Sequence, residues 1–561
     1  MPVSLTAFDI CIFLVSILVV LAIGLWAGRR EEDTKDFYLA GKTIPWWGVA
    51  GSIFGTNVSA EHLVGMLGIG YSIGFAQAHF EYGAIAALLI LAFVFLPLYR
   101  GMGLYTLSEY LGKRYDQRST VLYSAFNIVT IVVVRMALGF YIGARALSYL
   151  LDGTAIEVGY TAGIVIFAAV TATYTVFGGL KAVIWTDFLQ SVLLLLAGIF
   201  VAVLVFAQPE IGGLGGLLAK DAALPSDEQK FHLYLPPDHP QLPWTGVLSG
   251  LMIIHIFYWS TNQFIAQRAL AARSEFDARM GIITAGFLKL LIPFVSIATG
   301  VAAGFLFESR LASGEIAAMP LPDDAFPLLM QLVVPAGYGL VGIITAGLIG
   351  AILSSIDSMM NSGATLFTFD FYKRYIEPEA SDRRLILVGR VTIVVFVTVA
   401  AGIAAAIYTE DASDNFFLKV PAQIGHVVPG MAVAFLAGVL WRGASASGAF
   451  WSMLVAPAFS FAVERLYGAW AGGGSALAEA LTSLLGPQLN FLHRTALTAA
   501  FAVLVLVVLS LRDRSDPSEI ERYTWRARRI GADGARPFWR SERPWAWLLG
   551  AATVFMLVYF A

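Results

Sequence analysis

The segment from Gly51 to Gly74 has the apolar character of a membrane span but a composition that a regular helix does not favour. It contains six glycines and, inside its apolar run, the polar residues Asn57, Ser59, Glu61 and His62. An unpaired backbone group in hydrocarbon costs several kcal/mol, so irregular backbone persists at that depth only where protein encloses a cavity. An interrupted polar span of this kind indicates the ion and solute site of a secondary transporter.

The remainder of the chain has the composition of a membrane protein. Hydrophobic residues make up 58% of the 561 positions and charged residues only 13%. Apolar stretches near or above the ~20 residues that cross a bilayer recur along the whole length. We predict an all-α polytopic membrane protein with about fourteen transmembrane helices. The predicted spans are 5–27, 44–72, 78–99, 121–149, 157–178, 182–206, 243–268, 277–307, 337–368, 386–408, 416–440, 445–468, 492–511 and 544–561.

Basic residues are concentrated in the loops that follow the odd-numbered spans, which hold most of the 36 Lys and Arg residues. Because basic loops remain in the cytoplasm, the sequence predicts a protein of the cytoplasmic (plasma) membrane with both termini outside. We interpret the Arg-rich segment 512–543 as a topological signal rather than a lipid or partner site. The Pro-rich segment 207–242 is then an exterior connection or lid.

Several classes of protein are disfavoured by the sequence. Its only cysteine, Cys11, lies in the first predicted span, which excludes an intrachain disulfide and a multi-cysteine metal site. No basic residue precedes the first apolar run, so no cleavable signal peptide is expected. The sequence shows no Gly-rich phosphate loop, nucleotide-binding domain or set of nucleophile, base and oxyanion groups. We therefore expect neither ATP-driven transport by this chain alone nor a membrane enzyme, and no nucleic-acid partner.

The second and seventh predicted spans run in opposite directions, and each contains a Thr-Asn step in apolar surroundings. These steps are Thr56-Asn57 and Thr261-Asn262. The seventh span is five spans on from the second, which is the spacing of a five-plus-five inverted repeat that holds its solute at the pseudo-symmetric centre. The dipeptide match alone is weak, and the opposite orientation of the two polar spans is the stronger argument.

Five segments in collinear order resemble the sodium/solute symporter family, and within it the sodium/glucose and galactose branch. They are FYLAGKTIPWWGVAGSIFGTNVSAEHLVGM (37–66), GGLKAVIWTDFLQ (178–190), FYWSTNQFIAQRAL (257–270), FLKLLIP (287–293) and AILSSIDSMMNSGATLFTFDFY (351–372). The resemblance extends from Phe37 to Trp441 and implies a LeuT-like five-plus-five core with interrupted helices, preceded by one span and followed by three. The implied division is a first span and cytoplasmic loop 1–43, a first repeat 44–206, an exterior loop 207–242, a second repeat 243–441 and three C-terminal spans 442–561.

A sodium site is implied by the same resemblance. It maps onto the main-chain carbonyls of Gly55, Val58 and Ala351 and the hydroxyls of Ser354 and Ser355. Independently of the family, the run from Ser354 to Ser358 is unusually polar for the middle of a span. Isolated serines in spans often bond back to helix carbonyls or join helices, which is the alternative interpretation. Two adjacent serines opposite a broken helix favour the ion.

A second sodium has support from four further positions of the family. Asp187, Ser354, Asp357 and Ser358 occupy them here. A carboxylate inside a span is costly and by default functional, and Asp357 would attract a cation. Alternatively, Asp357 pairs with a basic residue at the cytoplasmic mouth. Both interpretations stay open.

A sugar site needs polar groups for the hydroxyls and an aromatic face for the ring. The resemblance assigns solute contact to Asn57, His62, Glu81, His255, Tyr258, Lys289 and the position of Pro421. It makes Tyr258 the stacking inner gate with Trp259 beside it, and Met66 and Phe80 the outer cover. Two positions depart from the branch: His255 replaces an amide or hydroxyl contact, and Pro421 replaces a Gln, for which Gln423 is the nearest substitute.

For several other charged and polar residues within the predicted spans, ordinary packing is the alternative to a role in transport. Lys289 lies about twelve residues into its span, roughly 18 Å from the surface at ~1.5 Å per residue, too far for its side chain to reach water. We therefore expect it to be buried beside Glu81. Arg135 has no matching motif, so a structural ion pair and a transport role are equally open. For His79 and His426 packing is the favoured role.

The sequence thus predicts a sodium-coupled symporter that imports a small sugar, with sodium, the solute and the bilayer as its partners. Carriers of an inositol, a sialic acid or a carboxylate are the alternatives on the same fold. Glu81 beside a basic side chain argues for a neutral polyol, because a carboxylate carrier is expected to present a basic group without Glu81 next to it. A membrane sensor is the alternative from another class, and such versions usually carry a fused signalling domain.

Overall fold

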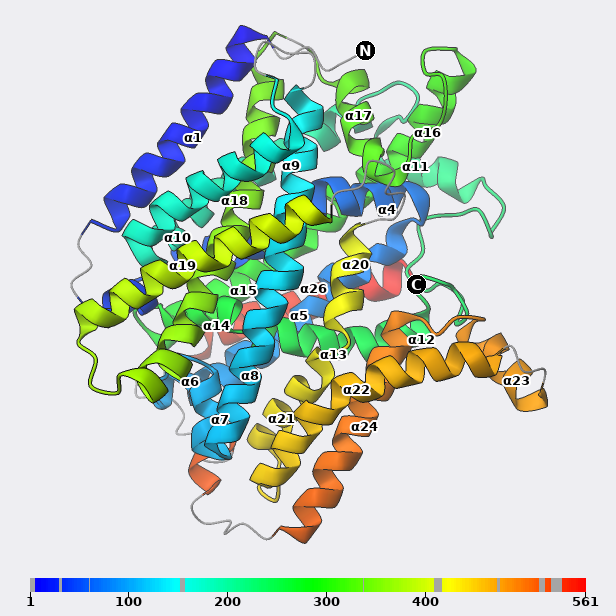
Figure 1. Cartoon of the computed structure of the whole chain (residues 1–561). Coiled ribbons are helices and arrows are strands. Elements are labelled where there is room, and N and C mark those ends of the chain that lie inside the picture. Colours follow the sequence, from blue (N-terminus) through cyan, green and yellow to red (C-terminus); the bar gives the residue numbers. More distant parts are fainter. Residues whose placement is uncertain are drawn as a thin grey trace.

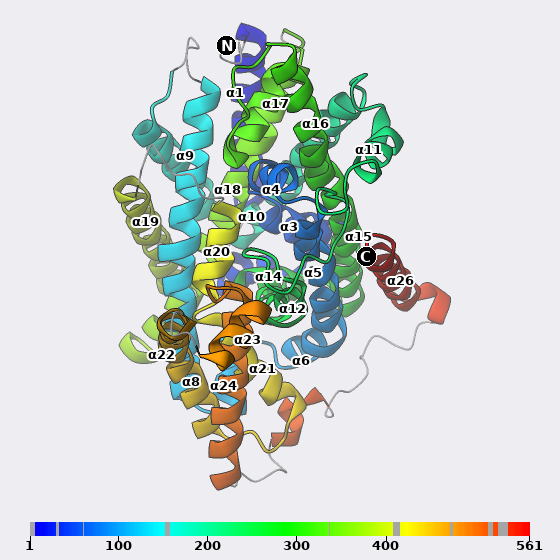
Figure 2. The ribbon, with the colours of Figure 1, turned by 90° about the vertical axis from the view of Figure 1, so that its right-hand side faces the viewer.

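The computed structural model describes residues 6–29, 33–59, 61–151, 157–335, 337–407, 416–471, 475–513, 520–525 and 537–561. Within these ranges the chain is helical, and the only β structure is two isolated bridges, Ile44 with Ala272 and Leu235 with Pro243. Figures 1 and 2 show the helices gathered into one elongated bundle. The Arg-rich segment 512–543 lies largely outside the described residues.

The helices of the first half are α1 (Ala7–Ala27), α2 (Thr34–Leu39), α3 (Trp46–Asn57), α4 (Met66–Ser72), α5 (His79–Ile90), α6 (Leu96–Gly101), α7 (Ser108–Arg114), α8 (Gln117–Val129), α9 (Ala137–Leu151), α10 (Tyr160–Phe206) and α11 (Gly213–Ala222). Those of the second half are α12 (Trp244–Gly246), α13 (Met252–His255), α14 (Gln263–Leu270), α15 (Glu275–Ile292), α16 (Ala298–Ala312), α17 (Ala325–Val333), α18 (Leu340–Leu366), α19 (Asp382–Ala406), α20 (Phe416–Ile424), α21 (Val428–Leu440), α22 (Ala446–Ala471), α23 (Ala476–Leu485), α24 (Phe491–Arg512) and α26 (Arg543–Tyr559). Short π-helical or 3₁₀ segments join many of them, including η2 (Glu61–Gly65), η3 (Phe75–Ala78), η4 (Leu91–Phe95), η5 (Thr130–Met136), η6 (Val247–Leu251), η7 (Ile256–Thr261), η8 (Pro293–Ile297) and η10 (Phe367–Ile376).

Among the described residues, nine helices are long and apolar enough to cross a membrane, or ten when α20 and α21, bent by 62°, are taken as one span. This confirms the helical membrane class but not the count of fourteen, which stays a prediction. The shortfall has local causes. The second and seventh predicted spans are interrupted, and α26 has only 17 residues.

Two predicted spans, 157–178 and 182–206, run together in the 47-residue helix α10. The helix is kinked at Gly179, whose φ of 49° and ψ of −152° lie in a region that a residue with a Cβ rarely enters. The kink falls between the two predicted spans. A glycine at this position allows the chain to change direction where the sequence indicated a connection.

Both Thr-Asn steps fall where a helix stops. Helix α3 ends at Asn57, and Val58 is extended, with φ −82° and ψ 100°. In the seventh predicted span, Asn262 is extended with φ −93° and ψ 134°, and its side chain accepts a hydrogen bond from the Phe264 N–H at the start of α14. The interruptions predicted from composition are therefore present in the backbone, whereas the inverted repeat stays a prediction.

The interrupted helices occupy the centre of the bundle (Figure 2). Helix α10 packs against α18, α1 and α3, and α15 packs against α3 and α5. The last helix, α26, lies against α5 and α15, where Leu549 fills the space left by Gly286. Figure 2 shows α22 and α24 at one end of the bundle and α26 at its side. The two broken helices are thus enclosed by protein, which is the condition for irregular backbone at membrane depth.

Candidate functional site

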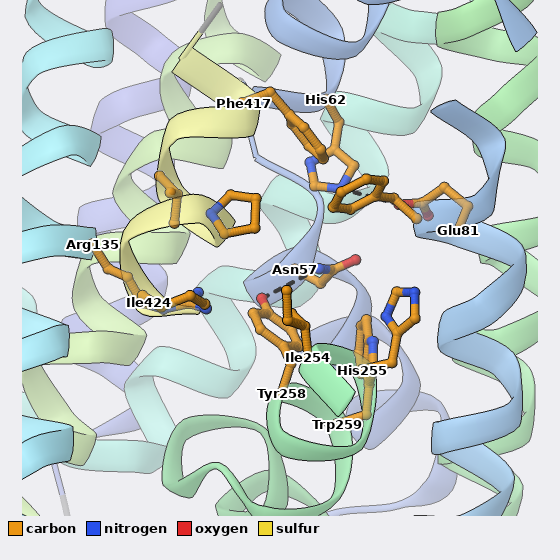
Figure 3. Close-up of a pocket in the computed structure, with 13 residues that line it drawn as sticks. Asn57, His62, Glu81, Arg135, Ile254, His255, Tyr258, Trp259, Phe417 and Ile424 are labelled. Carbon is orange, nitrogen blue, oxygen red and sulfur yellow. Dashed lines mark hydrogen bonds and ion pairs between the residues drawn. The ribbon is translucent and has the colours of Figure 1, made fainter. Parts of the chain in front are cut away.

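An interior cavity of about 90 Å³ lies beside both helix interruptions (Figure 3). Its lining comes from the first interrupted span, α5, η5, the α13–η7 segment and α20. The lining residues are Asn57, His62, Phe80, Glu81, Arg135, Ile254, His255, Tyr258, Trp259, Phe417, Val420, Pro421 and Ile424. Seven of the predicted solute contacts, together with the position of Pro421, are therefore brought to one place by segments more than 300 residues apart.

The polar side of the cavity is a closed network centred on Glu81. The Lys289 ammonium lies 2.6 Å from the Glu81 carboxylate and donates to the Asn57 Oδ1 atom, also at 2.6 Å. The His62 Nε2 atom lies 3.4 Å from the other Glu81 oxygen. Lys289 and Glu81 are both buried, 1% exposed each, so their pairing confirms the expectation drawn from the depth of Lys289.

The orientation of His62 follows from its two partners. Its Nδ1 atom accepts the Ser59 backbone N–H at 3.2 Å, so the ring proton is on Nε2, which faces Glu81. The adjacent backbone break positions this donor, because Ser59 follows the end of α3. The imidazole therefore donates to the carboxylate while remaining at the cavity wall.

Tyr258 and Trp259 form the aromatic side. The Asn57 amide donates to the Tyr258 hydroxyl at 3.2 Å, and the Lys289 ammonium lies 4.7 Å from the centre of the Trp259 ring. Arg135 covers Tyr258, with its guanidinium carbon 4.8 Å from the ring centre. Figure 3 shows Arg135 at one side of the cavity and Glu81 at the other.

Arg135 differs from Lys289, the cation of the Glu81 network. In the part of the chain that the structure describes, no carboxylate lies within ion-pair distance of its guanidinium, and its contacts are the rings of Tyr258 and Phe264. The structural ion pair that the sequence left open is thus not formed within the described ranges.

Three predicted contacts lie outside the lining. One of them, Lys289, is joined to it by its bonds to Asn57 and Glu81. The other two are Met66 and Gln423. Met66 is fully buried in α4, and Gln423 is exposed on α20 although its neighbour Pro421 lines the cavity. A residue two positions along a helix points about 200° away, which separates these two side chains. The solute roles of Met66 and Gln423 have no geometric support in this arrangement.

The apolar wall contains residues that the sequence analysis did not single out. Phe417 packs edge-on against His62 and Phe80, with ring centroids 5.6 Å and 5.3 Å away. Ile254, Val420 and Ile424 complete this wall. Because apolar residues are abundant in every span, no signal in the sequence distinguishes these from lipid-facing positions.

The two histidines for which packing was favoured lie elsewhere. His79 bonds to the Leu233 carbonyl at 3.0 Å, and His426 stacks on Phe461 with ring centroids 3.9 Å apart. Neither lines the cavity.

The predicted sodium position lies where α18 passes the end of α3. The Ser354 hydroxyl is 3.0 Å from the Gly55 carbonyl oxygen, and the Ser355 hydroxyl is 3.4 Å from the Thr56 carbonyl oxygen. A Cβ on Gly55 would lie 2.2 Å from the Ser191 hydroxyl, so glycine permits the close approach of α10 here. Val58 and Ala351 are buried in the same two segments. The site brings hydroxyl and carbonyl oxygens together, which are the ligands that hard cations prefer.

A second polar cluster adjoins this position and centres on Asp187. Its carboxylate accepts from the hydroxyls of Ser354 at 2.6 Å, Ser52 at 2.7 Å and Thr56 at 3.1 Å. The Arg268 guanidinium lies 3.5 Å from the same carboxylate and also donates to the Ser358 hydroxyl. Arg268 is fully buried, and the sequence analysis missed it, although a charged residue at the end of a predicted span was a visible signal.

Asp357 is the second carboxylate of this cluster. It accepts the Tyr174 hydroxyl at 2.5 Å and the Ser358 hydroxyl at 3.2 Å. No basic residue of the described chain forms an ion pair with Asp357. The nearby guanidinium, that of Arg268, pairs with Asp187. The four residues predicted for a second sodium therefore lie together. They include both carboxylates of the cluster, and the Arg268 guanidinium lies beside them.

Comparison with known proteins shows which family this chain resembles in sequence. The profile of the sodium:solute symporter family matches residues 37–456. The sodium/glucose cotransporter of Vibrio parahaemolyticus is 36% identical over 80% of this chain and 83% of its own length. The sodium/myo-inositol cotransporter 2 of Oryctolagus cuniculus is 30% identical over 94% of this chain and 80% of its own length.

A solved structure shares the fold. It is a sodium-coupled sialic acid symporter in a substrate-bound, outward-open state, 21% identical, with a TM-score of 0.75 over 91% of this chain and 98% of that one. The family profile covers well over half of the sequence, and the relatives named are cotransporters rather than enzymes. The chain belongs to the sodium:solute symporter family.

Proposed function

We propose that this protein is a sodium-coupled secondary active symporter that imports a small sugar by alternating access. The observation that carries the proposal is the interior ring of Asn57, His62, Glu81 and Lys289 beside the aromatic rings of Tyr258 and Trp259. The hydroxyl groups of a sugar can donate hydrogen bonds to such a network and accept hydrogen bonds from it. The apolar face of the sugar ring can pack on an aromatic side chain. Phe80 covers the cavity, while His255 supplies a further polar wall.

Sodium would bind between the end of α3 and α18, held by the carbonyls of Gly55, Val58 and Ala351 and the hydroxyls of Ser354 and Ser355. Binding there would hold the two helices together and increase the population of a state in which Asn57 is positioned for solute. Each charge that enters through ~100 mV contributes ~2.3 kcal/mol before any concentration term.

A second sodium is proposed at Asp187, Ser354, Asp357 and Ser358. Two buried carboxylates face a single guanidinium, that of Arg268, so one of them has no basic partner within the cluster. A buried carboxylate without a partner is neutralised either by a proton or by a further cation, and sodium is the cation that we propose there. The fourteen-span topology, the five-plus-five repeat, the plasma-membrane location and the exterior termini belong to the same proposal.

The direct test is uptake into liposomes that contain the purified full-length protein. We expect labelled hexoses or inositols to accumulate only when an inward sodium gradient is imposed, with competition among them revealing the preferred solute. Failure of every hexose, pentose and inositol to compete, combined with competition by a charged metabolite, would reject the sugar assignment.

The sodium ligands are tested by replacing Ser354 and Ser355 with Ala. Removing ligand oxygens weakens the ion shell while leaving little change in volume, so we expect the sodium concentration for half-maximal uptake to rise roughly tenfold in the double variant. Ser16→Ala, which removes a hydroxyl bonded to its own helix at Phe13, is the matched control. Unchanged sodium dependence in the double variant contradicts the assignment.

The stacking role of Tyr258 is tested by its Phe and Ala variants. Tyr258→Phe keeps the ring and loses the hydroxyl that accepts from Asn57, so a moderate loss of affinity is expected. Tyr258→Ala removes the ring itself. Base–aromatic stacking is worth ~1–3 kcal/mol, and with this as the upper guide for the apolar face of a sugar we expect solute affinity to fall by roughly fivefold to a hundredfold. Equal affinity of the Ala variant and the wild-type protein, measured by equilibrium binding, excludes this role.

One observation favours a second solute class. Arg135 lines the cavity opposite Glu81 and has no carboxylate partner in the described part of the chain. It is therefore a basic side chain without Glu81 beside it, the feature expected of a carrier for a carboxylate-bearing solute such as a sugar acid. The fold neighbour described above transports sialic acid, although its low identity supports the fold alone.

Arg135→Gln separates the two solute classes. For a neutral sugar, loss of the charge leaves most contacts in place, and affinity is expected to change by no more than a few fold. For a sugar acid, loss of a charge-assisted hydrogen bond worth about 1.5–3 kcal/mol lowers affinity by roughly tenfold to a hundredfold. Competition binding with matched pairs, each a sugar and its uronic acid, measures both effects in one variant.

A further inference from the structure

An exterior segment of the chain is hydrogen-bonded to the start of α5, the helix that carries Phe80 and Glu81 of the cavity lining. Residues 230–235 follow α11 and cross the outer ends of α4 and α5. The Lys230 ammonium donates to the Tyr71 carbonyl at 2.5 Å, and the Lys230 carbonyl accepts the Phe75 N–H at 2.7 Å. The Leu233 N–H donates to the carbonyl of Phe560, at the end of the last helix, at 2.7 Å. The segment is thus fixed at several points rather than lying loosely over the bundle.

Leu233 is the point at which this segment contacts a buried histidine. Its carbonyl oxygen lies 3.0 Å from His79 Nε2, and the ring of Tyr234 packs against the His79 ring with centroids 5.1 Å apart. A carbonyl oxygen only accepts, so Nε2 of His79 carries the proton. His79 is only 3% exposed, which removes water as a competing partner for this bond.

The next contact leads from His79 into the cavity. The backbone carbonyl of His79 lies 3.3 Å from Nε2 of His255, and His255 lines the cavity. By the same argument His255 carries its proton on Nε2, which leaves Nδ1 as a lone-pair acceptor. Within the described ranges no protein group donates to this Nδ1. The other polar groups of the cavity's Glu81 network already bond to one another.

The space for this geometry is set by a glycine. A Cβ on Gly83, one helical turn beyond His79, would lie 2.8 Å from His255 Nε2 and 2.9 Å from its Cδ2 atom. Any larger residue at 83 would displace the ring from the His79 carbonyl. Position 83 and the hydrogen bond at position 79 therefore constrain the same imidazole from one helix.

We infer that His79 is a positioning residue, held by the exterior segment 230–235, that fixes His255 as a hydrogen-bond acceptor for a donor group of the solute. This inference rests on the proposed function, because it assigns to His255 one solute hydroxyl. It makes the exterior segment a determinant of specificity: the bond from Leu233 fixes the start of α5, and the start of α5 fixes the side of His255 that the solute contacts.

The experiment combines a tautomer measurement with solute discrimination in the full-length protein. In liposomes containing ¹⁵N-histidine-labelled protein, the wild-type His255 Nδ1 is expected to be unprotonated, and His79→Leu and Gly83→Ala are expected to broaden or shift that resonance. His79→Gln, whose amide again donates to Leu233, is expected to restore it. His493→Gln, a buried histidine bonded to Thr245 away from the cavity, is the control.

Solute discrimination is measured as the affinity ratio between a transported hexose and each of its monodeoxy analogues. For one hydroxyl position the ratio is expected to be roughly tenfold in wild-type protein, to fall to about one in His79→Leu, and to return in His79→Gln. Sodium half-saturation is expected to stay unchanged in all of these variants. A merely structural role of His79 would lower affinity for parent and analogue alike, with no change in the ratio.

Two results overturn the inference: a wild-type His255 with its proton on Nδ1, or an unaltered deoxy ratio in His79→Leu. If no sugar is bound by the wild-type protein, the proposed function fails instead. The tautomer measurement still decides whether His79 positions His255, because it needs no solute.

Discussion

Glu81→Gln is expected to lower solute affinity by roughly a hundredfold or more and to destabilise the protein. The variant keeps the size of the side chain and one acceptor, but it leaves the Lys289 ammonium buried without its counter-charge. Breaking one partner of a buried ion pair typically costs ~3–5 kcal/mol, which is more than two orders of magnitude in an equilibrium constant. Equilibrium binding and thermal unfolding of the detergent-solubilised protein measure the two parts.

The control for this prediction is Glu210→Gln, the same substitution at a partly exposed pair with Arg310, where little change is expected. The double variant Glu81→Gln with Lys289→Met removes both charges and is expected to recover stability without recovering solute binding, since apolar replacement of a buried pair is often tolerated. If Glu81→Gln binds solute within a few fold of the wild-type protein, the pair does not organise the solute site.

Arg268→Met is expected to be the most destabilising substitution near the ion positions. Arg268 is fully buried, and its guanidinium faces Asp187 in a cluster that already contains Asp357. Its loss leaves two carboxylates with no basic partner, and we expect a loss of ~3–5 kcal/mol in the free energy of unfolding. Sodium is expected to restore part of this loss, because a cation that binds only the folded state stabilises it by mass action.

Thermal unfolding at several sodium concentrations, with potassium as the substitute ion, tests this prediction. Arg273→Met is the matched control, because the Arg273 side chain is 59% exposed and its partner Asp277 keeps its bonds from the Ser274 hydroxyl and the Trp46 N–H. Asp187→Asn in the Arg268→Met background is expected to regain stability while weakening the response to sodium. A variant as stable as Arg273→Met, with the same response to sodium, would show that Arg268 does not balance the cluster.

The helical membrane class and the pairing of Lys289 with Glu81 could be predicted from the sequence for physical reasons that act locally. Hydropathy locates spans because each must match the thickness of the bilayer by itself. Polar residues and glycines inside an apolar span indicate the breaks at Asn57 and Asn262, because a regular membrane helix does not favour such residues. The depth of Lys289 in its span indicated by itself that this residue needs a buried partner. Glu81 was the acidic residue that the family pattern placed nearby.

The remaining features depended on the tertiary structure. Which face of α20 borders the cavity depends on helix rotation, and that rotation places Pro421 inside and Gln423 outside. The approach of Arg268 to Asp187 joins residues 81 positions apart, with no motif that specifies the contact.

The bond from Leu233 to His79, and from His79 to His255, has the same origin. A backbone carbonyl carries no sequence signal, so nothing in the order of residues indicates which carbonyl a buried histidine will meet. Sequence determines what each segment needs, namely burial, a partner or a break in the helix. Only the packing of distant segments decides which group satisfies that need. The contacts that select this group form between residues that lie far apart in the sequence, so the order of residues does not specify them.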